Sequence, residues 1–254
     1  MGTPKLALED VSVVLGSKLI LRDISLEVGE HEFVCVIGAS GGGKTTLLRT
    51  VGGLIPAESG AVLLDGAPLP GPNPRLAMVF QHFSLFPWKS VRANVAYGLR
   101  VQGRRDDAGA VDRLLGVMRL TEVADHFPHQ LSGGMRQRVG IARALAVDPE
   151  VLLLDEPFSA VDAITREQLQ AEVLALWERD AARSAVLVTH DIDEAILMAD
   201  RVVVLSGPPG RITLEVPVPI PRPRSPYALR SHEDYPELRA RLWEAVRAGL
   251  EGAA

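Results

Sequence analysis

The chain has 254 residues, of which 47% are hydrophobic, and a formal net charge of −5. This hydrophobic content favours a folded domain with a sizeable core and argues against a disordered chain, while the acidic balance argues against a general nucleic-acid binder. The single cysteine, Cys35, excludes a disulfide framework. It lies in an apolar run, so we expect a buried, reduced thiol.

Neither a secretory signal nor a membrane span is predicted. The first ten residues lack a basic segment followed by an apolar core. No stretch approaches the roughly 18 uninterrupted apolar residues that a span requires. The sequence therefore predicts a soluble, cytoplasmic protein that reaches a membrane only by docking to another protein.

The first 80 residues predict strands around one glycine-rich loop. Apolar and β-branched residues on either side of Gly16 indicate an antiparallel hairpin. A short buried strand then leads into the loop, a helix follows it, and two more strands come next. These elements are expected at residues 6–14, 19–28, 33–37, 45–51, 61–64 and 76–80.

The rest of the chain predicts helices inserted into an α/β core, followed by a tail. From about residue 90 to 127, apolar residues recur at helical spacing. The Pro-rich residues 217–223 cannot form a central strand or a helix and indicate an extended connector. Further strands are expected at 151–154, 185–189 and 201–205, and helices after 131 and at 163–180, 191–199 and 236–250.

The most informative segment runs from Gly38 to Thr45 and fits the phosphate-loop pattern G-x-x-x-x-G-K-[ST]. Glycines let backbone N–H groups turn toward phosphate oxygens, and the following helix adds its positive N-terminus. We expect Lys44 to reach the β- and γ-phosphates and the Thr45 hydroxyl to bind Mg²⁺. A glycine-rich turn with an exposed lysine is the alternative. The expected nucleotide contacts are Gly38, Ala39, Ser40, Gly41, Gly42, Gly43, Lys44, Thr45 and Thr46.

An apolar run over residues 151–154 ends in Asp155 and Glu156. Ligands bind at strand ends in α/β sheets. Asp155 is therefore placed to hold Mg²⁺ beside Thr45, and Glu156 to take a proton from the attacking water. A solvated acidic strand end is the alternative, which the phosphate loop in the same chain makes less favourable.

A second glycine motif, Leu131-Ser132-Gly133-Gly134-Met135, opens a predicted helix. Ser132 suits the helix N-cap, but this does not explain two adjacent glycines. N–H groups and a hydroxyl at a helix start form another anion site. Because this motif cannot easily serve the same phosphates from within one chain, it indicates a nucleotide held between two copies.

Six motifs stand in the order seen in ATP-binding-cassette (ABC) ATPases, and the chain resembles that family up to about residue 205. The resemblance implies an α/β P-loop NTPase core with an N-terminal antiparallel β-subdomain and an inserted helical subdomain. The ATPase domain would span residues 1–216, with the helical subdomain at about 88–150, and a connector and C-terminal helix would span 217–254. The motifs are the phosphate loop, Gln81, residues 131–135, Asp155-Glu156, residues 159–162 and His190.

The resemblance also implies ATP and Mg²⁺ as cofactors and a head-to-tail homodimer. Gln81 would sense Mg²⁺ and water, and Asp162 would lie in the loop crossing the dimer interface. His190 would contact the γ-phosphate, although a capping or core histidine is the alternative. In trans, the nucleotide would meet Ser132, Gly133 and Gly134. The expected catalytic residues are Lys44, Gln81, Glu156 and His190, and the expected metal ligands are Thr45, Gln81 and Asp155.

Two positions depart from the family pattern. Leu15 stands where an aromatic residue usually stacks on adenine, and it supplies an apolar contact without π-stacking. Met135 stands at the end of the second motif, where glutamine is the commonest residue in the family. This position is not expected to touch phosphate. The sequence therefore predicts many contacts to the phosphates of the nucleotide and fewer contacts to its adenine.

Residues 83–88 and 91–95, which follow Gln81, resemble those of import cassettes, as do residues 131–145 and 207–212. The closest resemblance is to the nitrate/sulfonate/taurine group. The resemblance implies the ATPase of an importer on the inner face of the cell membrane, taking up a small solute such as nitrate, sulfonate or taurine. Its partners would be integral-membrane permease subunits and, indirectly, a solute-binding protein, with no nucleic acid. An exporter or lipid-traffic ATPase is the alternative, and a non-transport cassette is less favoured. The apolar residues expected to form a permease groove, or else ordinary core, are Phe83, Leu85, Phe86 and Trp88.

Overall fold

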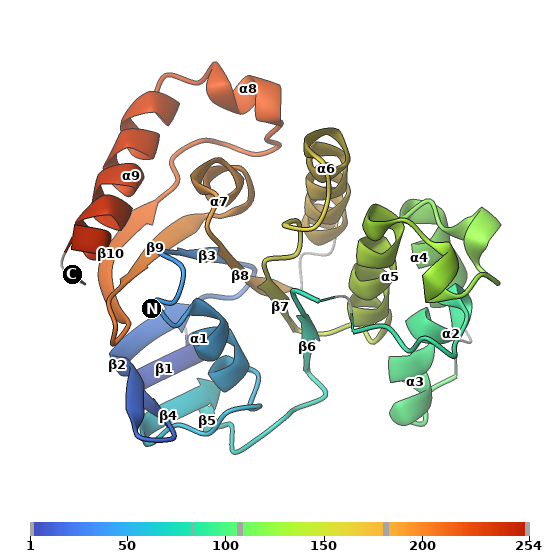
Figure 1. Cartoon of the computed structure of the whole chain (residues 1–254), viewed down its shortest axis with the longest axis horizontal. Coiled ribbons are helices and arrows are strands. Elements are labelled where there is room, and N and C mark those ends of the chain that lie inside the picture. Colours follow the sequence, from blue (N-terminus) through green and yellow to red (C-terminus); the bar gives the residue numbers. More distant parts are fainter. Residues whose placement is uncertain (1–2, 83, 106–108, 180–182, 252–254) are drawn as a thin grey trace. The chain divides into compact units, whose positions relative to one another are not determined.

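The computed structural model describes residues 3–82, 84–105, 109–179 and 183–251 (Figure 1). The chain forms two compact units. The first joins Met1–Asn73 to Ala182–Ala254, and the second is Pro74–Ala181. Among the residues described, no helix combines the length and apolar character needed to cross a bilayer.

The first unit contains an antiparallel sheet with strand order β2-β1-β4-β5. The first two strands form the hairpin that the sequence predicts, and its turn contains Gly16 at a φ of 63°. Many apolar side chains on these strands are buried and belong to the core. The strands are β1 (Leu6–Leu15), β2 (Lys18–Val28), β4 (Ser59–Leu64) and β5 (Ala67–Pro68).

The first unit also holds a parallel set of strands centred on β3 (Phe33–Ile37). It pairs in parallel with β8 (Ser184–Thr189) and with β9 (Arg201–Ser206). All five residues of β3 are buried, which explains its uninterrupted apolar sequence. Burial raises the pKa of the Cys35 thiol, so this cysteine is neutral and shielded, as expected.

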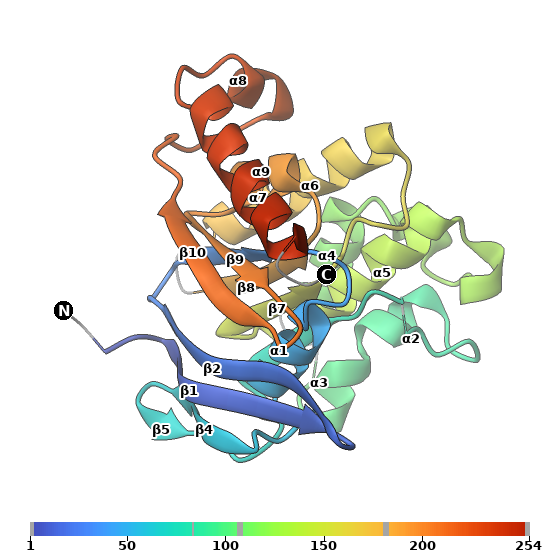
Figure 2. The same ribbon diagram turned by 60° about the vertical axis from the view of Figure 1, so that its left-hand side comes forward.

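The C-terminal part of the first unit has more regular structure than the sequence predicted. Strand β10 (Arg211–Pro217) pairs antiparallel with β9, and a short helix α8 (Pro226–Arg230) follows the connector. Helix α9 (Tyr235–Glu251) packs on β9 and on α7 (Ile192–Met198), as Figure 2 shows in red and orange. Pro217 ends β10, a place where a missing N–H is tolerated.

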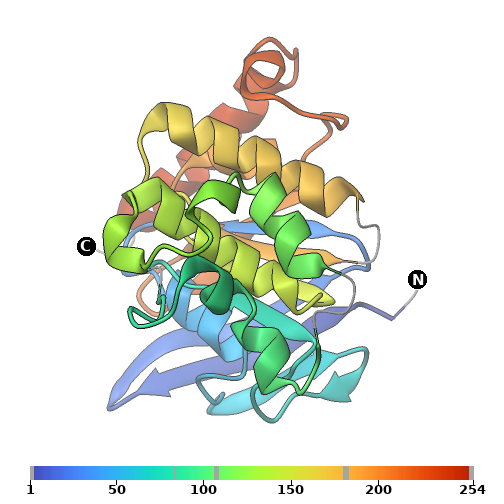
Figure 3. The same cartoon turned by 90° about the vertical axis from the view of Figure 1, so that its right-hand side faces the viewer.

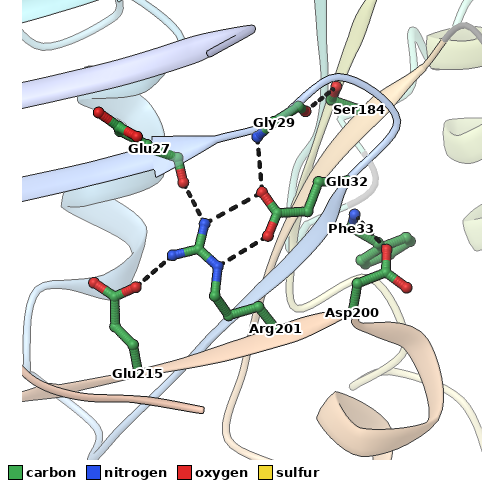
Figure 4. Close-up of polar contacts among 8 residues, drawn as sticks. All are labelled: Glu27, Gly29, Glu32, Phe33, Ser184, Asp200, Arg201 and Glu215. Atoms are coloured by element: carbon green, nitrogen blue, oxygen red, sulfur yellow. Dashed lines mark hydrogen bonds and ion pairs between the residues drawn. The ribbon is translucent and has the colours of Figure 1, made fainter. Parts of the chain in front are cut away.

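Arg201, at the start of β9, joins four segments of the first unit (Figure 4). Its Nε donates to Glu32 Oε1 at 2.9 Å, and its other nitrogens reach Glu215 and the backbone oxygen of Glu27. Glu32 also accepts a hydrogen bond from the Gly29 N–H at 2.7 Å. Burial alone would lower the pKa of Arg201, but the two carboxylates outweigh it and raise that pKa.

The second unit combines two parallel strands with a group of helices. Strand β6 (Leu76–Val79) pairs with β7 (Val151–Asp155). Helices α2, α3 and α4 contact α5, and Figure 3 shows them side by side in green. The helices are α2 (Val91–Val95), α3 (Tyr97–Val101), α4 (Ala110–Val117), α5 (Gly133–Ala146) and α6 (Ala163–Arg179), with 3₁₀ turns at Thr121–Val123 and Pro128–Gln130.

Candidate functional site

The glycine loop connects β3 to α1 (Lys44–Val51), the arrangement that a phosphate loop requires. A Cβ atom on Gly38 would lie 2.1 Å from the Leu205 backbone oxygen. A Cβ on Gly43 would lie 2.7 Å from a methyl group of Leu21, and the φ of Gly43 is 93°. Close packing and backbone conformation therefore both require glycine where the pattern has it.

Lys44 lies inside the curve of this loop. Its side chain is buried, with 6% exposed, and its Nζ donates to the backbone oxygens of Gly38 at 2.8 Å and Ala39 at 2.9 Å. The ammonium group is therefore held beside the first N–H groups of α1, which carry the positive end of the helix dipole. Thr45 and Thr46 are half-buried in the first turn of the same helix. The loop therefore places the Lys44 ammonium group and the N-terminal end of α1 together, an arrangement suited to an anion.

His190 lies at the same edge of the strands as the glycine loop. Ile37 of β3 pairs with Thr189 of β8, so the next residue in each parallel strand leaves the sheet at the same end. His190 is exposed, and the helix α7 that follows it is capped by Asp191. The Asp191 carboxylate accepts hydrogen bonds from the N–H groups of Asp193 at 2.9 Å and Glu194 at 3.1 Å. The histidine thus stands between a buried strand and a capped helix.

In the second unit, the structure brings Gln81 and Glu156 together although 75 residues separate them. Gln81 Nε2 donates to Glu156 Oε2 at 3.1 Å. The pairing of Val79 with Leu154 places both residues just beyond the ends of neighbouring parallel strands. Asp155 is almost fully buried as the last residue of β7, with 1% exposed. Glu156 turns the chain out of the strand at a φ of 43°.

Ser132 caps α5, and its Oγ accepts a hydrogen bond from the Met135 N–H at 3.2 Å. A cavity of about 390 Å³ opens at this helix start. Hydrogen bonds from Thr165 hold the pKa of Asp162, which lines the cavity, below its ordinary value. The lining also includes Gly133 and Gly134, so small residues leave the start of α5 accessible. Lys44 and His190 belong to the first unit, and Gln81, Asp155, Glu156 and Ser132 to the second.

Comparison with known proteins identifies the family to which this chain belongs. A family model described as ABC transporter matches residues 21–159. The nitrate import ATP-binding protein of Synechococcus elongatus is 46% identical over 229 residues, covering 88% of this chain and 83% of that protein. The aliphatic sulfonates import ATP-binding protein of Burkholderia cenocepacia is 45% identical over 254 residues, covering 100% of this chain and 92% of that protein. The chain belongs to the ABC transporter family.

A solved structure extends the agreement to the fold of this ABC ATPase. A dimeric ATP-binding cassette in a post-hydrolysis state, bound to ADP and Pi, is 32% identical with a TM-score of 0.74. The match covers 84% of this chain and 98% of the solved one. The predicted family, the P-loop NTPase fold class and ATP hydrolysis as the activity are thereby confirmed.

The loop after Gln81 has a support that the sequence did not reveal. Asn94 of α2 is fully buried, and its Nδ2 donates to the backbone oxygens of Phe86, Lys89 and Ser90 at 3.0 to 3.2 Å. Its Oδ1 accepts from the Phe86 N–H at 2.9 Å. The sequence offered one indication of this role, since Asn94 is a polar residue between Val91 and Val95 on the apolar face of a predicted helix. The Asn94 side chain therefore ties the backbone of Phe86 and Lys89 to α2 of the ABC ATPase.

This supported loop presents aromatic side chains to the surface. Trp88 is 71% exposed, whereas Leu85 and Phe86 are half-buried; Phe83 lies outside the described residues. The Phe86 ring packs 5.7 Å from the Trp88 ring and beneath the guanidinium of Arg143 from α5. The Arg143 Nη1 also donates to the Ser84 backbone oxygen at 2.7 Å. The backbone at Ser84 is thus tied to α5, the helix that Ser132 caps.

Replacing Asn94 by Ala is expected to destabilise the ABC ATPase by about 2 kcal/mol, because the loop backbone loses four hydrogen bonds to a buried side chain. Chemical denaturation of the purified protein measures this change. The control is Ala93→Gly on the same helix, which removes helix propensity but no side-chain hydrogen bond, with about 1 kcal/mol expected. Equal losses for the two variants would contradict the role given to Asn94.

Leu15 lies at the end of β1, opposite Lys18, and is 43% exposed. Its aliphatic side chain is therefore accessible on the hairpin, where the sequence expects it to meet adenine. Met135 is half-buried in the first turn of α5.

Proposed function

We propose that this ABC ATPase powers an importer of a small solute such as nitrate, a sulfonate or taurine. The observation that carries the proposal is the identity of 45–46% to a nitrate and an aliphatic sulfonates import protein, over most of each chain. Exporter ATPases share the catalytic motifs, but these relatives favour import. The partners would be integral-membrane permease subunits, with a solute-binding protein as an indirect partner. The ATPase would then lie on the inner face of the membrane.

In the proposed mechanism, two copies of the chain enclose ATP head to tail. The phosphate loop of one copy supplies Lys44 and backbone N–H groups to the β- and γ-phosphates, and Ser132, Gly133 and Gly134 of the other copy approach the γ-phosphate. The cavity at the start of α5 supports this second role, since it leaves that helix start accessible. The solved dimeric cassette supports the assembly.

Glu156 is proposed as the general base. Its carboxylate lies just beyond a buried strand and accepts a hydrogen bond from Gln81. In this proposal, that contact would help to orient the carboxylate toward the attacking water. His190 would donate a hydrogen bond to the γ-phosphate and stabilise the charge that develops there. Closing the dimer would bring the groups of the phosphate loop and α5 onto one nucleotide, and hydrolysis would release them.

Mg²⁺ is proposed to accompany the nucleotide. The donor set fits this ion, because Thr45, Gln81 and Asp155 offer a hydroxyl, an amide oxygen and a carboxylate, and Mg²⁺ prefers oxygen ligands shared with substrate phosphates. When bound, the ion would neutralise charge on the transferred phosphoryl group. Gln81 contacts Glu156 through its Nε2 group. Its amide oxygen is the atom that would serve as the metal ligand.

Uptake by cells lacking the native gene tests this proposal. Complementation with the wild-type chain is expected to restore ATP-dependent accumulation of labelled nitrate, sulfonate or taurine, whereas Lys44→Ala is expected to fail. Efflux of solute from preloaded cells, measured in the same strains, tests the exporter alternative. Restored efflux without uptake would overturn the importer assignment.

A further inference from the structure

The C-terminal segment, residues 218–251, contacts helix α7 at both of its ends. This helix begins two residues after His190 and packs against α9 (Figure 2). The contacts come from the connector after β10 and from the first turns of α9. All of these elements belong to the first unit.

Two arginines of the connector bind the C-terminal end of α7. Arg224 is buried, and its Nη1 donates to the backbone oxygens of Ile196 at 2.9 Å and Ala199 at 2.5 Å. Arg222 Nη2 donates to the Met198 oxygen at 2.6 Å. The last carbonyls of a helix lack partners within the helix, and cations there complement the helix dipole. These two arginines therefore anchor the C-terminal end of α7.

Two residues of α9 bind the first turn of α7. Arg239 Nε donates to Asp193 Oδ1 at 2.8 Å. Burial raises the pKa of Tyr235, and a hydrogen bond to the same Asp193 carboxylate raises it further. The Asp193 N–H in turn donates to the carboxylate of Asp191, the residue next to His190. A short chain of contacts thus leads from α9 through Asp193 to the side chain of Asp191.

We propose that Arg239 and Tyr235 are positioning residues for ATP hydrolysis, which act through Asp193 to fix the first turn of α7 and hence the direction in which His190 projects. The inference rests on the proposed function, because it requires His190 to act on the γ-phosphate. In this account α9 contributes to ATP hydrolysis indirectly, because it positions His190 without contacting the nucleotide.

The contacts separate this role from simple stabilisation. The Arg239 and Asp193 side chains are 48% and 38% exposed, and ion pairs exposed to this degree contribute little to stability. Buried Leu238 and Leu242 hold α9 on the fold independently. Losing Arg239 therefore leaves α9 docked and removes one of the side-chain contacts that hold the first turn of α7.

Steady-state ATP hydrolysis by the full chain tests the inference. Arg239→Ala is expected to lower kcat roughly 10-fold with KM for ATP unchanged, since small misplacements of a catalytic group cost rate rather than binding. The matched control is Arg241→Ala, an exposed arginine on the same helix, which is expected to behave like wild type. Thermal unfolding of each variant checks that the fold is retained.

A charge exchange supplies the decisive comparison. Asp193→Arg combined with Arg239→Asp restores an ion pair and is expected to recover part of the lost kcat, while either single change does not. If Arg239→Ala matches Arg241→Ala, or if its loss of kcat is not recovered by the exchange, the positioning role is overturned. His190→Ala, measured alongside, distinguishes the two failures. A wild-type rate for His190→Ala would overturn the proposed role of His190. A reduced rate for His190→Ala together with a wild-type rate for Arg239→Ala would overturn only the positioning role of Arg239.

Discussion

Glu156→Gln is expected to lower kcat for ATP hydrolysis roughly 100- to 1000-fold while ATP binding is retained, because an amide cannot accept the proton from water. The replacement has the same shape, and its oxygen can still accept the hydrogen bond that Gln81 donates to the native carboxylate. Phosphate release measures kcat, and titration with a fluorescent ATP analogue measures binding.

The matched control is Glu150→Gln, the same chemical change at the residue before β7. Glu150 forms an ion pair with Arg75 at 2.5 Å, away from the carboxyl end of the strand. We expect this variant to hydrolyse ATP at the wild-type rate. Wild-type hydrolysis by Glu156→Gln would exclude Glu156 as the general base.

Lys44→Ala is expected to weaken ATP binding about 10- to 100-fold, which corresponds to the loss of one charge-assisted hydrogen bond. The ammonium group of Lys44 lies inside the loop, within 2.9 Å of two backbone oxygens, and residues 38–45 contain no second cation that could take its place. Calorimetric titration with ATP measures the change. Arg49→Ala, an exposed cation later in α1, is expected to bind ATP normally. Equal affinities for the two variants would contradict the assignment of Lys44.

The parts of the fold that the sequence predicted depend on local patterns. The uninterrupted apolar run of β3 and the glycines at 38 and 43 follow from burial and from close packing at a few adjacent positions. The sequence did not predict strand β10, although Ile212, Leu214 and Val216 alternate with polar residues. The Pro-rich residues that follow are typical of a connector, and they obscured this alternation.

The support of the site depends on contacts between distant residues, which a single sequence does not record. Arg239 and Asp193 are 46 positions apart, and neither lies in a recognisable motif. Gln81 and Glu156 were both singled out, but their mutual hydrogen bond depends on the pairing of β6 with β7. The roles assigned to the site residues remain predictions that the variants above test.

The two-copy site is tested most directly by the mass of the Glu156→Gln protein in solution, measured by analytical ultracentrifugation with and without Mg²⁺ and ATP. We expect one chain without nucleotide and two chains with ATP. Adding Gly134→Asp should keep ATP binding but prevent the dimer, because a carboxylate in the cavity at the start of α5 would repel the γ-phosphate. A Glu156→Gln protein that binds ATP and still sediments as one chain would contradict a nucleotide site shared between two copies.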